Sequence, residues 1–297
     1  MTDPAQTRSA PTAAPHATEE TTTQLATHSR LRNGRGMDRA FDASLWMFVV
    51  FYAGLLIAML WVIVAATDLA ELRAALAEPA IIASTRLSLL SSTLAAIMSV
   101  WIAVPVGYIL VRHDFPGKSI LDAIIDIPIV LPPLVVGLCL LILFQTPVGR
   151  FFEEHVFGVT YEVPAVVLSQ FVVACAFAVR TMRVTFEQID PRYEQVALTL
   201  GCNRAAAFYR VLLPEARKGI VAAGTIAWAR SLGEFGPILV FAGSTPFKTE
   251  VMPSTVFLEL SYGNLKGALA VSILMIAIAL IVLGFARLLG LQGGLRG

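Results

Sequence analysis

The stretch LSLLSSTLAAIMSVWIAVPVGYILV, from Leu87 to Val111, contains no charged side chain and lies between Arg86 and Arg112. An α-helix needs about 20 predominantly apolar residues to cross the ~30 Å hydrocarbon core of a membrane. This stretch meets that length, so it predicts a transmembrane helix.

Similar apolar runs recur along the chain, which is 57% hydrophobic and only 14% charged. Soluble domains are about 25% charged, so the composition indicates a membrane protein. Four more runs are free of charged residues: Ala43–Thr67, Ile127–Gly149, Val163–Val179 and Gly267–Ala286. One more run, Gly219–Ala242, is the fifth of the six in chain order and is apolar except for Arg230 and Glu234. We therefore expect an all-α membrane protein with six transmembrane helices.

The basic residues divide unevenly between the two sides of the membrane that six spans would define. With a cytoplasmic N-terminus, 16 of the 22 Lys and Arg residues lie on the cytoplasmic side and five on the other, while Arg230 lies within a span. Cytoplasmic loops of membrane proteins carry an excess of Lys and Arg. We therefore expect both termini to be cytoplasmic, which also places the loop 187–214 in the cytoplasm.

Residues 1–36 are rich in Thr, Ala and Pro and contain almost no large apolar side chains. Such a segment cannot bury enough surface to fold, so we expect a disordered N-terminal tail. The segment also lacks the early apolar region of about 7–15 residues that a secretory signal needs.

Metal and nucleotide chemistry find little support in the sequence. The three cysteines, Cys139, Cys175 and Cys202, form no CxxC pair, and the four histidines show no HxxxH or HExxH spacing. The GKS at Gly117–Ser119 lacks the first glycine of a phosphate-binding loop. A net charge of +1 does not point to nucleic acid. We expect no metal, no cofactor, no nucleic-acid partner and no ATPase site in this chain.

The segment DIPIVLPP, from Asp126 to Pro133, opens the third apolar run. Its prolines remove backbone donors and kink or break a helix. Neighbouring helices or water must then satisfy the freed carbonyl groups. Two interpretations are open, a kinked entrance to a helix or a bend that lines a pore.

The charged segment EQVALTLGCNRAAAFYRVLLP, from Glu194 to Pro214, lies between two apolar runs. Asp190 suits an N-cap, and Pro191 suits the first helical position. Gly201 can adopt a positive φ and so end a first helix, whereas Pro214 ends a second. We expect a helical hairpin that serves either as an interfacial helix or as a dock for a soluble partner.

This hairpin resembles the cytoplasmic loop of ABC importer permeases, which reads E-A-A, three residues, G, nine residues and I-x-L-P. The segment 195–197 and Gly201 reproduce the first spacing, and the segment 211–214 reproduces the second. Gln195 stands in the acidic position and Glu194 lies one place earlier, so both are candidates to contact the ATPase. The resemblance implies these ATPase-coupling residues: Glu194, Gln195, Val196, Ala197, Gly201, Val211, Leu213 and Pro214.

Two further stretches resemble the molybdate, tungstate and sulfate permeases of the same class. ARSLGEFGPILVFAGSTPFKTEVMP, Ala229–Pro253, is similar to their fifth-span signature, and LPPLVVGLCLLILF, Leu131–Phe144, is similar to their third span. The resemblance covers roughly residues 83–288. It implies a type-I ABC importer permease fold, in which a core of five transmembrane helices follows a first helix at 43–67.

The resemblance implies a permease that imports an oxyanion across the bacterial inner membrane by alternating access. Two copies of the chain, or the chain and a paralogue, would form the pathway. A cytoplasmic ABC ATPase dimer would bind the loops 187–214, and a periplasmic binding protein would deliver the substrate. Molybdate or tungstate is the first expectation, and sulfate or thiosulfate is the second. An ATP-independent channel or secondary carrier is the alternative from a different class.

Arg230 and Glu234 lie near the middle of the fifth apolar run, where an ionised side chain is costly. Because they are four residues apart, they share one helix face and can pair with each other. The pair is either a structural lock between helices or part of a gate. Together with Gly233 and Gly236, where a helix can pivot, these are the candidate pathway or gate residues.

Overall fold

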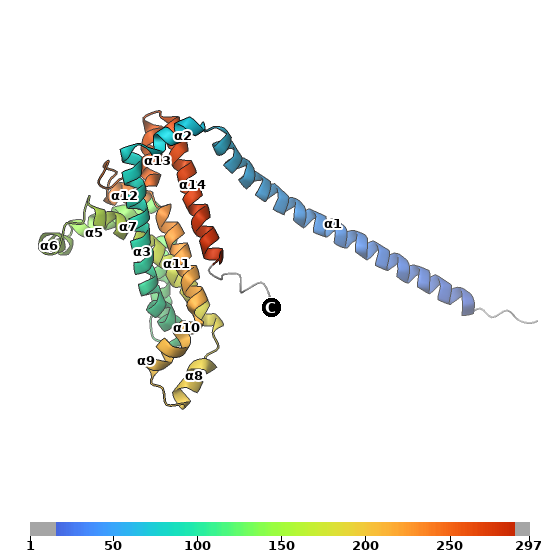
Figure 1. Cartoon of the computed structure of the whole chain (residues 1–297). Helices are drawn as coiled ribbons and strands as arrows, with labels where there is room; N and C mark the ends of the chain where they lie inside the picture. The colour runs from blue at the N-terminus through green and yellow to red at the C-terminus, as the bar shows by residue number, and fades with distance from the viewer. Residues whose placement is uncertain (1–15, 289–297) are drawn as a thin grey trace, which may run out of the picture. The chain divides into compact units, whose positions relative to one another are not determined.

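The computed structural model of the chain describes residues 16–288. Within this range the regular elements are helices, and no strand occurs (Figure 1). The expected all-α class is therefore confirmed. It suits a membrane protein, because lipid offers no hydrogen-bond partners and a helix satisfies its own backbone groups.

The chain divides into two compact units, Met1–Val64 and Ala65–Gly297. The first unit contains α1 (His16–Ala65) up to the boundary. The apolar part of α1, Phe41–Ala65, has a mean hydropathy of 2.6 and is long enough to span a membrane. This part agrees with the first span expected at 43–67.

The expected disorder of residues 1–36 stays a prediction. The structure continues α1 through residues 16–36, while residues 1–15 lie outside the described range. Starting a helix is costly, whereas adding residues to an existing helix gains one hydrogen bond for each residue fixed. The adjoining apolar span provides that existing helix, so the polar segment can extend it without a core of its own.

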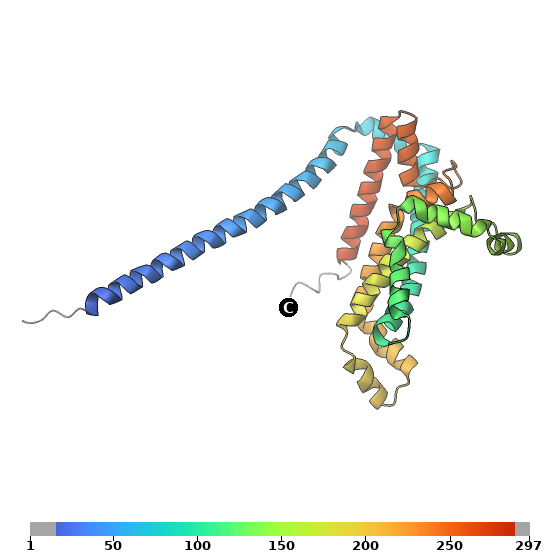
Figure 2. The same ribbon diagram turned by 180° about the vertical axis from the view of Figure 1, so that it is seen from behind.

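The second unit is a bundle of helices of very different lengths. In chain order they are α2 (Leu69–Leu76), α3 (Pro79–Arg112), α4 (Lys118–Val130), α5 (Pro133–Gln145), α6 (Pro147–His155), α7 (Val163–Gln188), α8 (Arg192–Thr199), α9 (Arg204–Ala207), the π-helix η1 (Phe208–Leu212), α10 (Leu213–Glu215), α11 (Arg217–Leu232), α12 (Gly236–Phe241), α13 (Met252–Ser261) and α14 (Leu265–Leu288). The long helices α3, α7 and α11 lie side by side (Figures 1 and 2). The short helices α8 and α9 lie at one end of this bundle, and α2 and α13 lie at the other.

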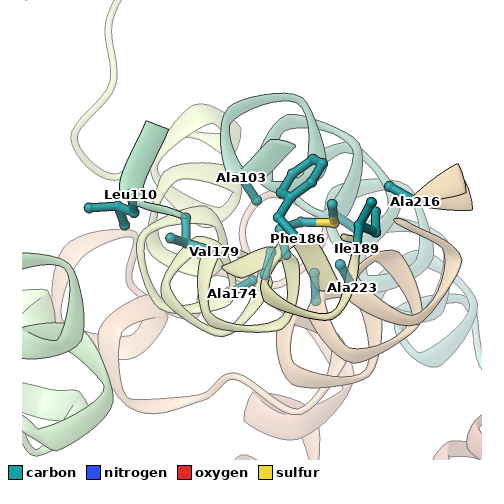
Figure 3. Packing of buried hydrophobic residues seen from close by; sticks show 12 residues of the cluster. Ala103, Leu110, Ala174, Val179, Phe186, Ile189, Ala216 and Ala223 are labelled. Atoms are coloured by element: carbon teal, nitrogen blue, oxygen red, sulfur yellow. The ribbon is translucent and has the colours of Figure 1, made fainter. Parts of the chain in front are cut away.

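Small side chains let α3, α7 and α11 approach closely, as is common between helices in membranes. A Cβ added to Gly107 of α3 would lie 2.9 Å from the Cβ of Met182 in α7. One added to Gly219 of α11 would lie 2.1 Å from Oγ1 of Thr185 in α7. Buried alanines and Phe186 fill the remaining space between the helices (Figure 3). The core is therefore centred on the helices that flank the hairpin.

The third apolar run, expected as a span at 127–149, is divided in two. Helix α4 ends at Val130 and α5 begins at Pro133, and the two helices are bent by 114° relative to each other. Leu131 and Pro132 between them have extended backbone angles. Proline removes a backbone donor and its ring clashes with the preceding turn, so the two adjacent prolines prevent a continuous helix.

The fifth apolar run is divided as well. Helix α11 ends at Leu232, and the shorter α12 begins at Gly236. Within residues 16–288, four helices are long and apolar enough to cross a membrane, or five if α4 and α5 form one bent span. The expected number of six spans therefore stays a prediction, because the fifth run does not form one long helix.

Candidate functional site

The first helix of the hairpin, α8, ends at Thr199, and Gly201 forms the turn that follows it, as the sequence predicts. Gly201 has a φ of +89° and donates its N–H to the carbonyl of Leu198 at 3.0 Å. The N–H of Cys202 donates to the carbonyl of Ala197 at 3.1 Å. These two bonds form a Schellman motif, which satisfies carbonyls at the end of a helix and turns the chain sharply.

The two hairpin helices begin at polar caps. The side chain of Asp190 accepts a hydrogen bond from the N–H of Arg192 at 2.9 Å, and α8 starts one residue later than Pro191. The side chain of Asn203 accepts one from the N–H of Ala206 at 2.8 Å and caps α9. Asn203 was not among the expected residues, although an Asn followed by a short helical run is a recognisable cap signal.

The second half of the hairpin contains a π-helical turn that the sequence did not predict. Residues Phe208–Leu212 form η1, directly before Leu213 and Pro214. Leu212 is fully buried, whereas Val211 and Leu213 are half-buried. Single π-helical turns are rare and occur frequently at functional sites, because they shift the helix face by one residue.

The hairpin exposes an apolar surface. Val196 is 55% exposed and Leu200 is 80% exposed, whereas Ala197 faces the interior. A groove of about 540 Å³ runs along this surface and is lined by Asp190, Arg192, Tyr193, Val196, Ala197, Leu200, Cys202 and Val211. Exposed apolar patches with a polar rim mark interaction sites. Of the expected coupling residues, Val196 therefore faces outward and Ala197 faces the interior.

The two candidates for the acidic position face different ways. The Tyr108 hydroxyl donates a hydrogen bond to Oε1 of Glu194 at 2.7 Å, and Nε of Arg112 lies 3.8 Å from Oε2. The side chain of Glu194 is only 15% exposed, whereas Gln195 is exposed. Neither Tyr108 nor Arg112 was expected from the sequence. Their common partner Glu194 is distant in the chain, 86 residues from Tyr108.

The second candidate site lies at the end of α11. Nη1 of Arg230 is 2.5 Å from Oε2 of Glu234, which confirms the expected pairing. The Glu234 side chain is 2% exposed and that of Arg230 is 31% exposed. The guanidinium of Arg230 also lies over the ring of Phe177 in α7, 5.8 Å from its centroid. The pair therefore joins the last turn of α11 to the break that follows it.

The two broken runs pack against each other at their breaks. A Cβ added to Gly236 would lie 2.9 Å from the Cβ of Pro133, and one added to Gly137 would lie 2.7 Å from the Cα of Pro237. Helices α5 and α12 thus start in contact (Figures 1 and 2). Gly233 is different, because its nearest neighbour would be the carbonyl of Ala229 in its own helix at 3.8 Å. Gly137 was not expected from the sequence, because a single glycine in an apolar run gives no sign of the helix that packs against it.

The described part of the chain shows no group of three or more His, Cys, Asp or Glu side chains placed to bind a metal ion. The residues Cys139, Cys175 and Cys202 are free thiols. The sites described above offer an exposed apolar surface at the hairpin and two helices that meet at paired breaks.

Comparison with protein families gives one match that covers most of the chain. The family described as "Binding-protein-dependent transport system inner membrane component" matches residues 95–291. This range includes the hairpin and both helix breaks.

Curated relatives include permeases for several oxyanions. The molybdenum transport system permease protein ModB of Escherichia coli K12 is 38% identical over 205 residues, which cover 66% of this chain and 88% of the relative. The sulfate transport system permease protein CysT of Salmonella typhimurium is 33% identical over 208 residues, 69% of this chain and 75% of the relative. The molybdate/tungstate transport system permease protein WtpB of Pyrococcus abyssi is 32% identical over 247 residues, which cover 83% of this chain and 93% of the relative.

Solved structures with a similar fold include chains of ABC transporters. A bacterial ABC transporter involved in the import of the acidic polysaccharide alginate has a TM-score of 0.63 at 16% identity, over 82% of this chain and 96% of that chain. The MetNI methionine ABC transporter has a TM-score of 0.56 at 18% identity, over 70% of this chain and 94% of that chain. At these identities the likeness concerns the fold alone.

Proposed function

Because the chain belongs to the family of binding-protein-dependent transport system inner membrane components, we propose that it is the membrane permease of an ATP-driven oxyanion importer, with molybdate or tungstate as the first substrate. It is a permease subunit of the ABC importer class, and ATP is hydrolysed by a partner subunit. The observation that carries the proposal is the exposed apolar hairpin between α7 and α11. An exposed apolar patch with a polar rim marks an interaction site, and a soluble partner is the occupant that we propose for it.

The hairpin is the proposed dock for a cytoplasmic ABC ATPase. Its outward residues Val196 and Leu200 and the adjoining groove supply the apolar contact area. The Schellman turn at Gly201 fixes the angle between α8 and α9, so the hairpin presents a rigid surface. One ATPase subunit binds each of two permease chains, and closure of the ATPase dimer moves the two hairpins together.

The partners and topology follow from the same proposal. A second copy of the chain or a paralogue completes the pathway, and a periplasmic binding protein delivers the anion. The broken fifth run, α11 with α12, crosses the membrane as the fifth span and brings the number of spans to six, and both termini are cytoplasmic. The 16 basic residues on the cytoplasmic side and five on the other support this orientation.

The paired helix breaks are the proposed gate region. Arg230 and Glu234 neutralise each other, so the pair is unsuited to hold an anion tightly by Arg230 alone. Glycine contacts between α5 and α12 make this the point where a movement of α11 reaches the third run. Glu234 and Gly236 belong to the gate, whereas Gly233 provides open space beside it.

Sulfate or thiosulfate is the second candidate substrate, because CysT matches a similar length of the chain at 33% identity, against 38% for ModB. The test is uptake of radiolabelled molybdate by cells that express the chain together with its ATPase and its binding protein. We expect unlabelled tungstate to compete and sulfate in equal excess to compete weakly. Strong competition by sulfate alone would transfer the assignment to sulfate, and no uptake of either anion would contradict the oxyanion proposal.

A further inference from the structure

Glu194 is turned into the protein, although it belongs to an otherwise exposed hairpin helix. Its neighbours on α8, Tyr193 and Gln195, are exposed, whereas the Glu194 carboxylate lies against the end of α3. Its Oε1 accepts a hydrogen bond from Tyr108 at 2.7 Å, and its Oε2 lies 3.8 Å from Nε of Arg112. Hydrogen bonds to a charged group are roughly twice as strong as neutral ones.

Arg112 joins the same group of residues from the other side. Its Nη2 donates a hydrogen bond to the carbonyl of Ile189 at 2.7 Å, at the residue that ends α7. The side chain of Arg112 is only 11% exposed, and a charge with so little solvent requires a partner. Arg112 therefore fixes the start of the hairpin while the Glu194 carboxylate balances its charge.

The ring of Tyr108 touches both ends of the hairpin. It packs edge-on against Phe208 of η1, with centroids 4.8 Å apart, and against Phe186 near the end of α7, at 5.9 Å. Its hydroxyl bonds to α8. One residue of α3 thus contacts the segment before the hairpin, its first helix and its second helix.

Helix α3 connects this end of the bundle to the other end. Oγ of Ser88 accepts a hydrogen bond from the N–H of Met252, the first residue of α13, at 2.8 Å. Twenty residues of α-helix separate Ser88 from Tyr108, which is about 30 Å at 1.5 Å per residue. Helix α3, with Pro105 inside it, is therefore the element that joins the end at Tyr108 and Arg112 to α13.

We propose that Glu194 is a positioning residue that ties the hairpin to α3, and that Gln195 and Val196 carry the contact with the partner. The inference rests on the proposed function, since it concerns how movement of the docked hairpin reaches the pathway. Through Tyr108 and Arg112, the carboxylate makes α8 and α3 move together. Without this tie the hairpin still binds the ATPase, but α3 follows only part of the displacement of α8.

The test uses the complete transporter in proteoliposomes, with ATP hydrolysis and substrate uptake measured on the same sample. Tyr108→Phe removes only a hydroxyl, and Glu194→Gln keeps the shape of the side chain. We expect each to retain ATP hydrolysis within about twofold and to lower the uptake per ATP by about tenfold, a typical size for coupling between sites. The double variant should lose less than the two single variants combined, because both substitutions weaken the same bond between Tyr108 and Glu194.

Two controls separate this tie from the dock. Glu154→Gln makes the same chemical change in α6, far from the hairpin, and should leave the ratio of uptake to hydrolysis unchanged (Figure 1). Gln195→Ala should instead raise the ATPase concentration needed for assembly, with the ratio retained once the complex forms.

The outcomes distinguish the inference from the function on which it rests. If the wild-type chain binds no ATPase, the proposed function fails. If the wild-type complex transports and Tyr108→Phe keeps the wild-type ratio, the tie is overturned and the proposed function stands. Additive losses in the double variant would also overturn the tie, because they would show that the two groups act independently.

Discussion

Gly201 combines a φ of +89° with open space, because a Cβ added there would meet no heavy atom within 4 Å. The cost of a side chain at this position is therefore backbone strain, about 1–2 kcal/mol for a left-handed residue. We predict that Gly201→Val will lower co-purification of the ATPase with the permease. Gly201→Asn should retain most of it, since Asn tolerates this conformation.

Gly158 provides the matched control for this prediction. A Cβ added to Gly158 also meets nothing within 4 Å, but its backbone is not left-handed. Gly158→Val should therefore assemble as the wild type does. Normal assembly and uptake in Gly201→Val would rule out the assignment of the dock.

The ion pair between Arg230 and Glu234 should make a single substitution more harmful than a double substitution. Because Glu234 is 2% exposed, removal of Arg230 leaves a carboxylate with little solvent and without its cation. We predict that Arg230→Met will reduce the folded protein, measured by gel filtration in detergent, more than the double variant Arg230→Met, Glu234→Gln does. Glu234→Gln alone should be milder, since the 31% exposed Arg230 keeps access to solvent.

Uptake by the double variant then decides between lock and gate. A double variant that folds but does not transport would favour the gate. Normal transport by both single variants would show that the pair is neither, and that the position of the fifth span needs revision.

Local rules predicted the residues whose partners lie nearby in the chain. The positive φ of Gly201 and the pairing of Arg230 with Glu234 each depend on a few adjacent residues, and both are confirmed. The roles of Tyr108 and Arg112 could not be predicted, because their partners are brought close only by the packing of α3 against the hairpin. The choice between Glu194 and Gln195 depended on the same packing.

At the scale of helices, the contact between α5 and α12 depends on glycine. A Cβ at Gly137 would lie 2.7 Å from the backbone of Pro237, which has no flexible side chain to move aside. Overpacking of this kind costs roughly 1–3 kcal/mol. We predict that Gly137→Ala will lower the melting temperature of the purified permease, whereas Gly233→Ala will leave it nearly unchanged. Equal effects of the two substitutions would contradict the packing of the two breaks.

The prolines predicted a break in the third run but not its geometry. Pro132 and Pro133 end α4 by local sterics, which the sequence shows directly. The bend of 114° and the contact with α12 depend on which helix meets the freed end. The π-helical turn at Phe208–Leu212 was not predicted either, since helical spacing in the sequence does not distinguish one extra residue in a turn.

For the whole chain, the distribution of basic residues predicts a topology. Six spans place both ends of the chain in the cytoplasm, with 16 basic residues on that side. We predict that alkaline phosphatase fused after Gly297 will be inactive and that a cytoplasmic reporter at the same position will be active. Phosphatase activity from the C-terminal fusion would mean that the number of spans is odd, and that α11 and α12 do not cross together.

Hydropathy predicted the class of fold and most of the spans, because long apolar runs have few stable alternatives in a membrane. The family could be predicted from the hairpin and two further stretches, since the spacing of glycine and proline in the hairpin is fixed by its turns. The anion could not, because the relatives that share these motifs include both sulfate and molybdate permeases.

The central claim is that this chain moves an oxyanion through a pathway driven by an ATPase bound to its hairpin. The most direct measurement is uptake of radiolabelled molybdate by proteoliposomes that contain the permease, its ATPase and its binding protein. The account predicts uptake only when ATP is present on the side of the hairpin, and its loss in Gly201→Val with the ATPase intact. Uptake by the permease alone, driven by an ion gradient without ATP, would contradict it and would show a secondary carrier or channel.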